Sequence, residues 1–150
     1  MSERARRFAY RLERLLTLRG AEREALRAPV AAAAAEVERR EREAAALTDG
    51  IRRVEEALRS LRGGERIAVD EQLRLQAWLR RERQLEQAKR AEVDAALNAL
   101  ARVAGELQDK HRETKVLESH KDRSRRRHED AAARAALKSA DDAWLARRKP

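Results

Sequence analysis

Apolar residues recur every three or four positions through the first half of the chain. From residue 30 onward the steps alternate three and four, which is the spacing of the contact stripe in a coiled coil. The stripe is interrupted once, by Arg40. Its positions are Val30, Ala33, Val37, Arg40, Ala44, Leu47, Ile51, Val54, Leu58 and Leu61. The pattern predicts a long amphipathic helix over about residues 3–61.

The stripe is weaker nearer the N-terminus. It begins at Phe8, Leu12 and Leu15, but its next positions are Arg19 and Glu22, where we expect loose or hydrated helix contact.

Pro29 falls where the spacing slips by one residue. A proline lacks the backbone N–H that an interior helical position needs, and the slip is a stutter in the heptad pattern. We expect a kink near residues 25–29, or a helix that restarts with Pro29 in its first turn.

Two adjacent glycines, Gly63 and Gly64, interrupt the helical pattern and predict a turn over about residues 62–69. A second helix is predicted over about residues 70–147, starting near Val69 or Asp70. Its stripe is expected to contain Leu75, Trp78 or Leu79, Leu85, Val93, Leu97, Leu100, Ala104, Leu107 and Leu117.

Each of the two helices has one apolar stripe to bury, and the short turn makes the other helix the nearest surface. The predicted fold is therefore all-α: one domain over residues 1–150, with two long helices in an antiparallel coiled-coil hairpin and the C-terminal helix longer. Folding about the turn pairs positions whose numbers sum to about 130, such as Val37 with Val93.

This register leaves the open end of the hairpin poorly covered. Residues 118–130 contain no apolar residue, so Leu12, Leu15, Leu16 and Leu18 are expected to remain partly exposed. Residues 131–150 run past the N-terminus and would project roughly 30 Å if fully helical.

Composition narrows the class of protein. Charged residues are 42% of the chain and aromatic residues 3%, which leaves too little bulky apolar volume for a thick globular core. Disorder is the competing interpretation, and the regular apolar spacing argues against it. The chain has no Cys, no apolar run long enough to span a bilayer and no signal-peptide core, so we expect a soluble cytoplasmic protein.

The net charge of +9 is concentrated in two segments. Residues 1–27 carry eight Arg and four Glu, and residues 110–128 carry eight Lys or Arg and three acids. The hairpin register brings these segments together. They form either a basic collar for an acidic cavity or nucleic acid, or an ordinary solvated face. No aromatic residue is interleaved with the downstream arginines, which disfavours nucleic acid.

Residues suited to catalysis are sparse. The sequence has no Gly-rich phosphate loop and no GxSxG motif. His111, His120 and His128 are spaced nine and eight residues apart, so they do not share a helical face and are expected to be solvated. We expect no enzyme activity, no cofactor and no metal. Trp78 is either a residue of the stripe or an exposed anchor for a partner.

Three segments carry a family resemblance. They are FAYRLERLLTLR (residues 8–19) followed by Glu22 and Glu24, then KVLE (residues 115–118), then the pair Asp141 and Asp142. With the chain length and the central break, they resemble the FliJ family of flagellar export proteins. That family has a glutamate at the position of Asp142.

The resemblance implies a non-enzymatic stalk of the flagellar type III export apparatus, similar to the central stalk of rotary ATP synthases. Such a protein would bind the export ATPase hexamer and its regulator, connect them to the membrane export gate, and escort export chaperones. It would lie in the cytoplasm, peripheral to the inner membrane at the flagellar base. The virulence secretion systems use a related stalk protein.

The resemblance and the charge pattern together nominate two sets of residues. The set for the ATPase ring is Arg7, Arg11, Leu12, Leu15, Arg19, Lys115, Leu117, Arg123, Arg126 and Arg127. The set for the export gate is Trp78, Leu85 and Lys89.

Two other functions remain open. One is a basic coiled-coil protein that binds nucleic acid, and the other is a structural homodimer. A hairpin predicts a monomer in isolation, with weak self-association through Leu12 to Leu18.

Overall fold

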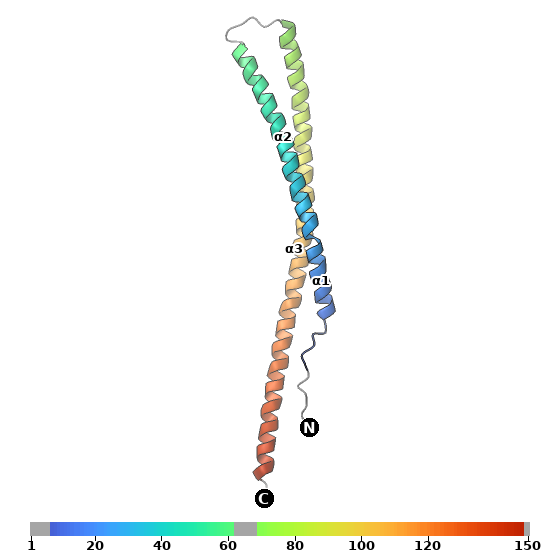
Figure 1. Cartoon of the computed structure of the whole chain (residues 1–150), viewed down its shortest axis with the longest axis vertical. Helices are drawn as coiled ribbons and strands as arrows, with labels where there is room; N and C mark the ends of the chain where they lie inside the picture. The colour runs from blue at the N-terminus through green and yellow to red at the C-terminus, as the bar shows by residue number, and fades with distance from the viewer. Residues whose placement is uncertain (1–6, 62–68, 149–150) are drawn as a thin grey trace. The chain divides into compact units, whose positions relative to one another are not determined.

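The computed structural model describes residues 7–61 and 69–148, whose regular secondary structure is entirely α-helical (Figure 1). Helix α1 spans Glu13–Ala25, α2 spans Arg27–Leu61 and α3 spans Val69–Arg148. The all-α class is confirmed. The predicted turn with Gly63 and Gly64, together with Arg4 and Arg6, lies outside the described residues.

The first predicted helix is divided in two near the proline. Helix α1 ends at Ala25 and α2 begins at Arg27, which places Pro29 in the first turn of α2. Proline suits this turn because its missing N–H would have had no partner within the helix. A helix that restarts around Pro29 was one of the two predicted outcomes.

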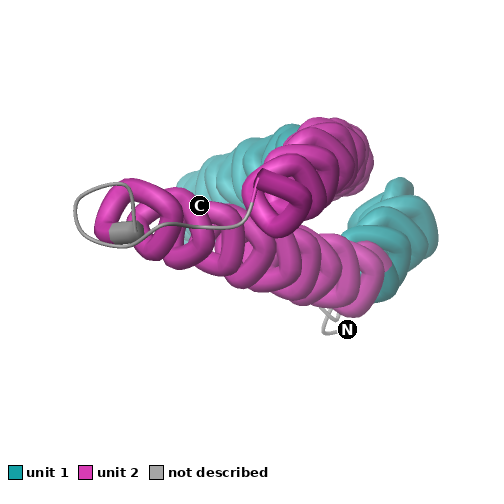
Figure 2. The backbone as a smooth tube through the Cα atoms, turned by 90° about the horizontal axis from the view of Figure 1, so that it is seen from above, with its two compact units in different colours: residues 1–25, 108–150 teal, residues 26–107 magenta. Residues whose placement is uncertain are grey.

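Contacts divide the chain into two compact units (Figure 2). Unit 1 contains residues 1–25 and 108–150, and unit 2 contains residues 26–107. Helix α3 contributes residues to both.

Unit 2 is held by a small apolar core. Ile51 and Leu58 of α2 pack with Leu79 of α3, and all three are buried. Leu75 and Trp78 are among the partly buried residues around them. Leu79 therefore occupies the stripe position for which Trp78 was the alternative, and Trp78 covers its edge.

Two predicted stripe residues of α3 are wrong. Leu85 is 46% exposed and Leu97 is 42% exposed. Three- and four-residue steps from the buried Leu79 lead to Glu82 and Glu86, which are half-buried in place of Leu85. Leu85 lies one residue away from the contact face, because Leu79 sets the phase of the helix.

Polar contacts across unit 2 give the direction of pairing. Arg83 pairs with Glu55, Thr48 donates to Glu86 at 2.7 Å, and Lys89 donates to Glu43 at 3.3 Å. Within unit 2, residue numbers rise along α3 as they fall along α2, and the numbers of these three pairs sum to 138, 134 and 132.

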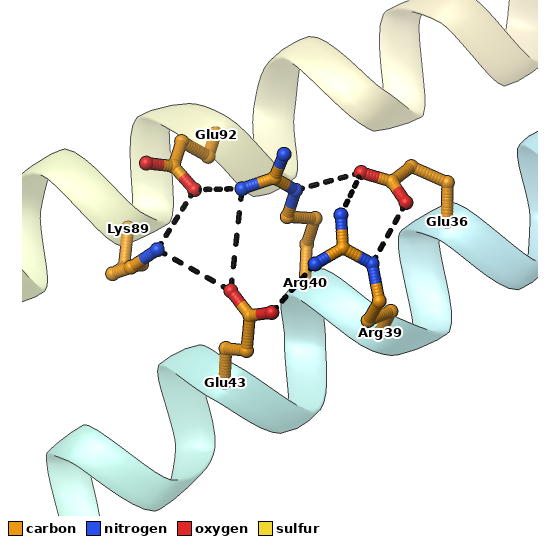
Figure 3. Close-up of polar contacts among 6 residues, drawn as sticks. All are labelled: Glu36, Arg39, Arg40, Glu43, Lys89 and Glu92. Atoms are coloured by element: carbon orange, nitrogen blue, oxygen red, sulfur yellow. Dashed lines mark hydrogen bonds and ion pairs between the residues drawn. The ribbon is translucent and has the colours of Figure 1, made fainter.

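Arg40, the charged residue in the stripe of α2, lies in an ionic network (Figure 3). It pairs with Glu92 of α3 and donates from Nε to Glu36 at 2.8 Å. Lys89 of α3 contacts Glu43 of α2 at 3.3 Å and Glu92 of its own helix at 3.1 Å. It therefore forms a second ionic link between the two helices. Because Arg40 occupies a stripe position, this layer of the helix contact is not apolar. The carboxylates of Glu36 and Glu92 compensate the charge of Arg40 instead.

The network shifts the pKa values of its members. Hydrogen bonds from Lys89 lower the pKa of the Glu43 and Glu92 carboxyl groups, and the Arg39 guanidinium does the same for Glu36. A hydrogen bond to Glu92 raises the pKa of Lys89.

These shifts predict loss of stability in acid. A carboxyl group whose pKa is lower in the folded state stabilises the fold above its unfolded pKa of about 4.5, and that stabilisation is lost as the pH falls below this value. The melting temperature, followed by circular dichroism, should therefore fall between about pH 5 and pH 3. Replacing Glu43 and Glu92 with Gln should flatten this dependence, whereas replacing the exposed Glu41 should not. An unchanged slope in the double variant would contradict the assignment.

Candidate partner-binding site

All ten residues nominated for the ATPase ring belong to unit 1. This unit combines α1, the segment that precedes it and the C-terminal part of α3.

The segment before α1 is not helical. Residues 7–12 were predicted within the first helix, but α1 begins at Glu13, whose N–H donates to the Tyr10 carbonyl at 3.1 Å. The side chain of Tyr10 is buried against α3, with 9% of its surface exposed.

Tyr10 attaches this segment to α3 by its hydroxyl. The hydroxyl donates to the Leu117 carbonyl oxygen at 3.2 Å and lies 2.9 Å from Nδ1 of His120. Since the hydroxyl has one proton, Nδ1 of His120 is the donor when both bonds form. His120 is half-buried, so its prediction as a solvated residue is wrong.

Phe8 places an aromatic ring beside the arginine-rich part of α3. Its ring lies 5.7 Å from that of His128, and the Arg125 guanidinium lies 5.9 Å from its centroid, within cation–π range. The predicted register placed Phe8 near residue 122. Non-helical chain advances roughly 3.3 Å per residue against about 1.5 Å in a helix, so the segment reaches further along α3.

Arg19 and Glu22, where loose or hydrated contact was predicted, form a partly exposed ionic layer. Arg19 pairs with Glu22 at 2.9 Å and with Glu113 of α3 at 3.2 Å, while Lys110 pairs with Glu22 at 3.0 Å. The hydrogen bond from Arg19 lowers the pKa of Glu22. Next to this layer Thr114 is buried, and its hydroxyl donates to the Lys110 carbonyl at 2.8 Å. The sequence pattern gave no sign of this buried threonine.

The leucines of α1, and Leu12 just before it, are partly exposed as predicted. Leu12 is 39% exposed, Leu15 is 38% exposed and Leu18 is 53% exposed, whereas Leu16 is half-buried. An exposed row of leucines on one short helix is a candidate contact surface for another protein.

The nominated basic residues differ in their availability. Six of them are exposed: Arg7, Arg11, Lys115, Arg123, Arg126 and Arg127. Arg19 is half-buried in its ionic layer, and Leu117 is half-buried with its carbonyl bound by Tyr10. The structure thus brings eight of the ten to the surface of unit 1, counting Leu12 and Leu15.

The last part of α3 has no cover from the described residues. Every residue from Glu129 to Arg148 is exposed, including Leu137 and Trp144. The Arg148 guanidinium lies 4.1 Å from the Trp144 ring centroid. These twenty residues span about 30 Å at the helical rise.

The residues nominated for the export gate belong to unit 2. Trp78 is half-buried against the apolar core, and Lys89 is held by Glu43 and Glu92. Leu85 is the exposed member of the three.

Within residues 7–61 and 69–148, no helix offers an apolar stretch that could cross a bilayer, and no group of His, Asp or Glu is arranged to hold a metal ion. No protein-family model matches the chain, and neither the curated proteins nor the solved structures compared with it include a match.

Removing the Tyr10 hydroxyl should loosen the N-terminal segment. Tyr10→Phe keeps the ring but loses the bonds to Leu117 and His120, with an expected cost of about 1 kcal/mol in the free energy of unfolding. Hydrogen exchange of residues 7–16 should become faster. In a His120→Ala background the same substitution should cost less, because the partner is already absent. Equal costs in both backgrounds would contradict the coupling.

Proposed function

We propose that the chain works by binding other proteins, as an antiparallel coiled-coil hairpin whose open end is the docking surface. The observation that carries this proposal is the combination, within unit 1, of exposed leucines on α1 with exposed arginines on α3. Apolar side chains supply binding energy, and the arginines supply charge complementarity and speed of association.

The chemistry of this surface suits an acidic cavity. Arg123, Arg126 and Arg127 follow the three- and four-residue steps of one broad helical face, and the part of α3 beyond them is uncovered. A rod with a basic collar and an exposed helical end can insert into a pore lined by carboxylates.

The resemblance to the FliJ family suggests which pore this is. The partner would be the hexameric export ATPase with its regulator, at the flagellar base beside the inner membrane. In that setting the chain is a stalk that promotes ring assembly and ATP turnover, and it performs no chemistry itself.

The gate contact follows from the same resemblance. Leu85 would be its accessible residue, with Trp78 and Lys89 supporting the surface from their contacts in unit 2. Export chaperones would be further partners.

Nucleic acid binding is the second candidate. Phe8 beside Arg125 supplies an aromatic ring next to a cation, an arrangement used for single strands. Phe8 is already half-buried and in tilted contact with the ring of His128, which reduces the surface that it can offer to a base.

One experiment separates these functions. The turnover and hexamer formation of the export ATPase are measured with and without the full chain, and binding of duplex and single-stranded DNA is measured beside them. The proposal predicts faster turnover and more hexamer. No binding to the ATPase, together with DNA affinity that falls steeply with salt, would favour the nucleic-acid function.

A further inference from the structure

Unit 2 contains a groove that none of the nominated sites uses. Two adjoining hollows of about 540 Å³ and about 470 Å³ share Glu55, Arg59 and Arg83 in their walls. Leu58 and Leu79 line the first hollow, and Ile51 lines the second. These three buried residues of the apolar core form the floor of the groove.

Each wall of the groove is one face of a helix. The wall from α2 consists of Thr48, Arg52, Glu55 and Arg59, which are spaced four, three and four residues apart. The wall from α3 consists of Gln76, Arg80, Arg83, Gln87 and Arg90, with the same alternation. The α3 wall extends over 15 residues, from Gln76 to Arg90, which is about 21 Å of helix.

The groove is separate from the residues nominated for the export gate. Trp78 follows Gln76 of the α3 wall by two residues, and Leu85 follows Arg83 by two residues. Two residues correspond to a rotation of roughly 200° around a helix. The groove and the gate residues therefore occupy nearly opposite faces of α3.

The charge of the groove is positive. Five arginines and two glutamates line the two hollows. Both glutamates are engaged, since Glu55 pairs with Arg83 and Glu86 pairs with Arg90 at 2.7 Å. Arg59 and Arg80 stand on opposite walls, and neither has an ion pair with any residue that the structure describes. Arg59 and Arg80 therefore offer two positive charges beside an apolar floor. A partner with carboxylates next to apolar side chains would complement both features.

We propose that this groove binds an acidic amphipathic helix of a partner protein. Its apolar side would rest over Leu58 and Leu79, and its acidic flanks would meet Arg59 and Arg80. A helix fits because each wall of the groove is itself one face of a helix, so a third helix can lie along the two walls. Of the other arginines in the walls, Arg52 pairs with Asp49, Arg83 with Glu55 and Arg90 with Glu86. No aromatic residue is among those that line either hollow, so stacking of bases has no platform there.

The test uses the full chain and a synthetic probe. The probe is a fluorescent peptide of about 21 residues with Leu at the a and d positions of its heptads and Glu at e and g. Repulsion between its glutamates keeps it from pairing with itself. Its twin carries Lys at e and g, and a duplex DNA of similar length is the third ligand. Affinities are measured by fluorescence anisotropy at low salt.

The acidic peptide is expected to bind the wild-type chain, and the Lys peptide is not. Arg59→Gln with Arg80→Gln should weaken binding roughly tenfold. The matched control is Arg81→Gln with Arg102→Gln, which removes two exposed arginines of unit 2 outside the groove and should change affinity less than about twofold.

Three results would overturn the proposal. They are no binding of the acidic peptide, equal loss of affinity in the groove and control variants, and tighter binding of duplex DNA that depends on Arg59 and Arg80. The last result would assign the groove to nucleic acid. Circular dichroism of each variant establishes that the helices are intact.

Discussion

Leu79→Ala is expected to lower the free energy of unfolding of unit 2 by about 2–3 kcal/mol. Leu79 is 8% exposed and contacts Ile51 and Leu58 in a core with few other buried side chains among the described residues. Truncating a buried leucine removes its transfer free energy and leaves a cavity, and a thin two-helix core has little material to fill it. Denaturation by urea, followed by circular dichroism, measures the loss.

Leu85→Ala is the matched control for this substitution. It removes the same atoms from the same helix at a position that is 46% exposed, so it should cost less than about 1 kcal/mol. A similar cost for both substitutions would mean that Leu85, not Leu79, marks the phase of the contact face.

Reversing three charges in unit 1 is expected to weaken strongly the proposed binding to the export ATPase. The substitutions are Arg123→Glu, Arg126→Glu and Arg127→Glu, at exposed positions of α3. If the partner surface is acidic, each reversal replaces an attraction with a repulsion, and affinity should fall by roughly a hundredfold or more. Titration of the chain into the ATPase, with turnover as the second readout, measures the loss.

The control for charge reversal lies in unit 2. Arg74→Glu, Arg81→Glu and Arg102→Glu change the net charge equally, at exposed positions away from the basic collar. This variant should bind the ATPase with nearly wild-type affinity. If both variants lose affinity alike, net charge governs the association, and the proposed docking surface is wrong.

Local sequence patterns predicted much of the fold. The alternation of three and four apolar steps predicted long helices, because the period of an α-helix brings such positions onto one face. Pro29 predicted either a kink or a restart, since its ring excludes it from an unbroken helix interior, and the structure has the restart at α2. The exposure of Leu12, Leu15 and Leu18 was predicted from the lack of apolar residues in 118–130, although the ion pairs Glu13–Lys121 and Arg19–Glu113 place residues 113–121 opposite α1.

The candidate docking residues were predictable for the same reason. Arginines in a segment without apolar residues have nothing to pack against, so Arg123, Arg126 and Arg127 are exposed. The nominated gate residues were less well predicted, because Trp78 and Lys89 are engaged by neighbours whose identity depends on the partner helix.

Tertiary contacts decided the remaining features. Whether Trp78 or Leu79 enters the core depended on the packing against Ile51 and Leu58, which no single helix determines. That Arg40 would be satisfied depended on Glu92 lying opposite it. The burial of Tyr10 on His120 replaced predicted helix with extended chain, because a long-range contact outweighed local propensity.

For this protein the sequence by itself determined helix class, the break near Pro29, and the segments that remain exposed, because all three depend on spacing within one helix. Only the tertiary structure decided the phase of α3, the ionic layers and the arginine-lined groove. Each of these depends on which side chains of a second helix lie opposite, to within one residue, and a repeating pattern does not specify that alignment so finely.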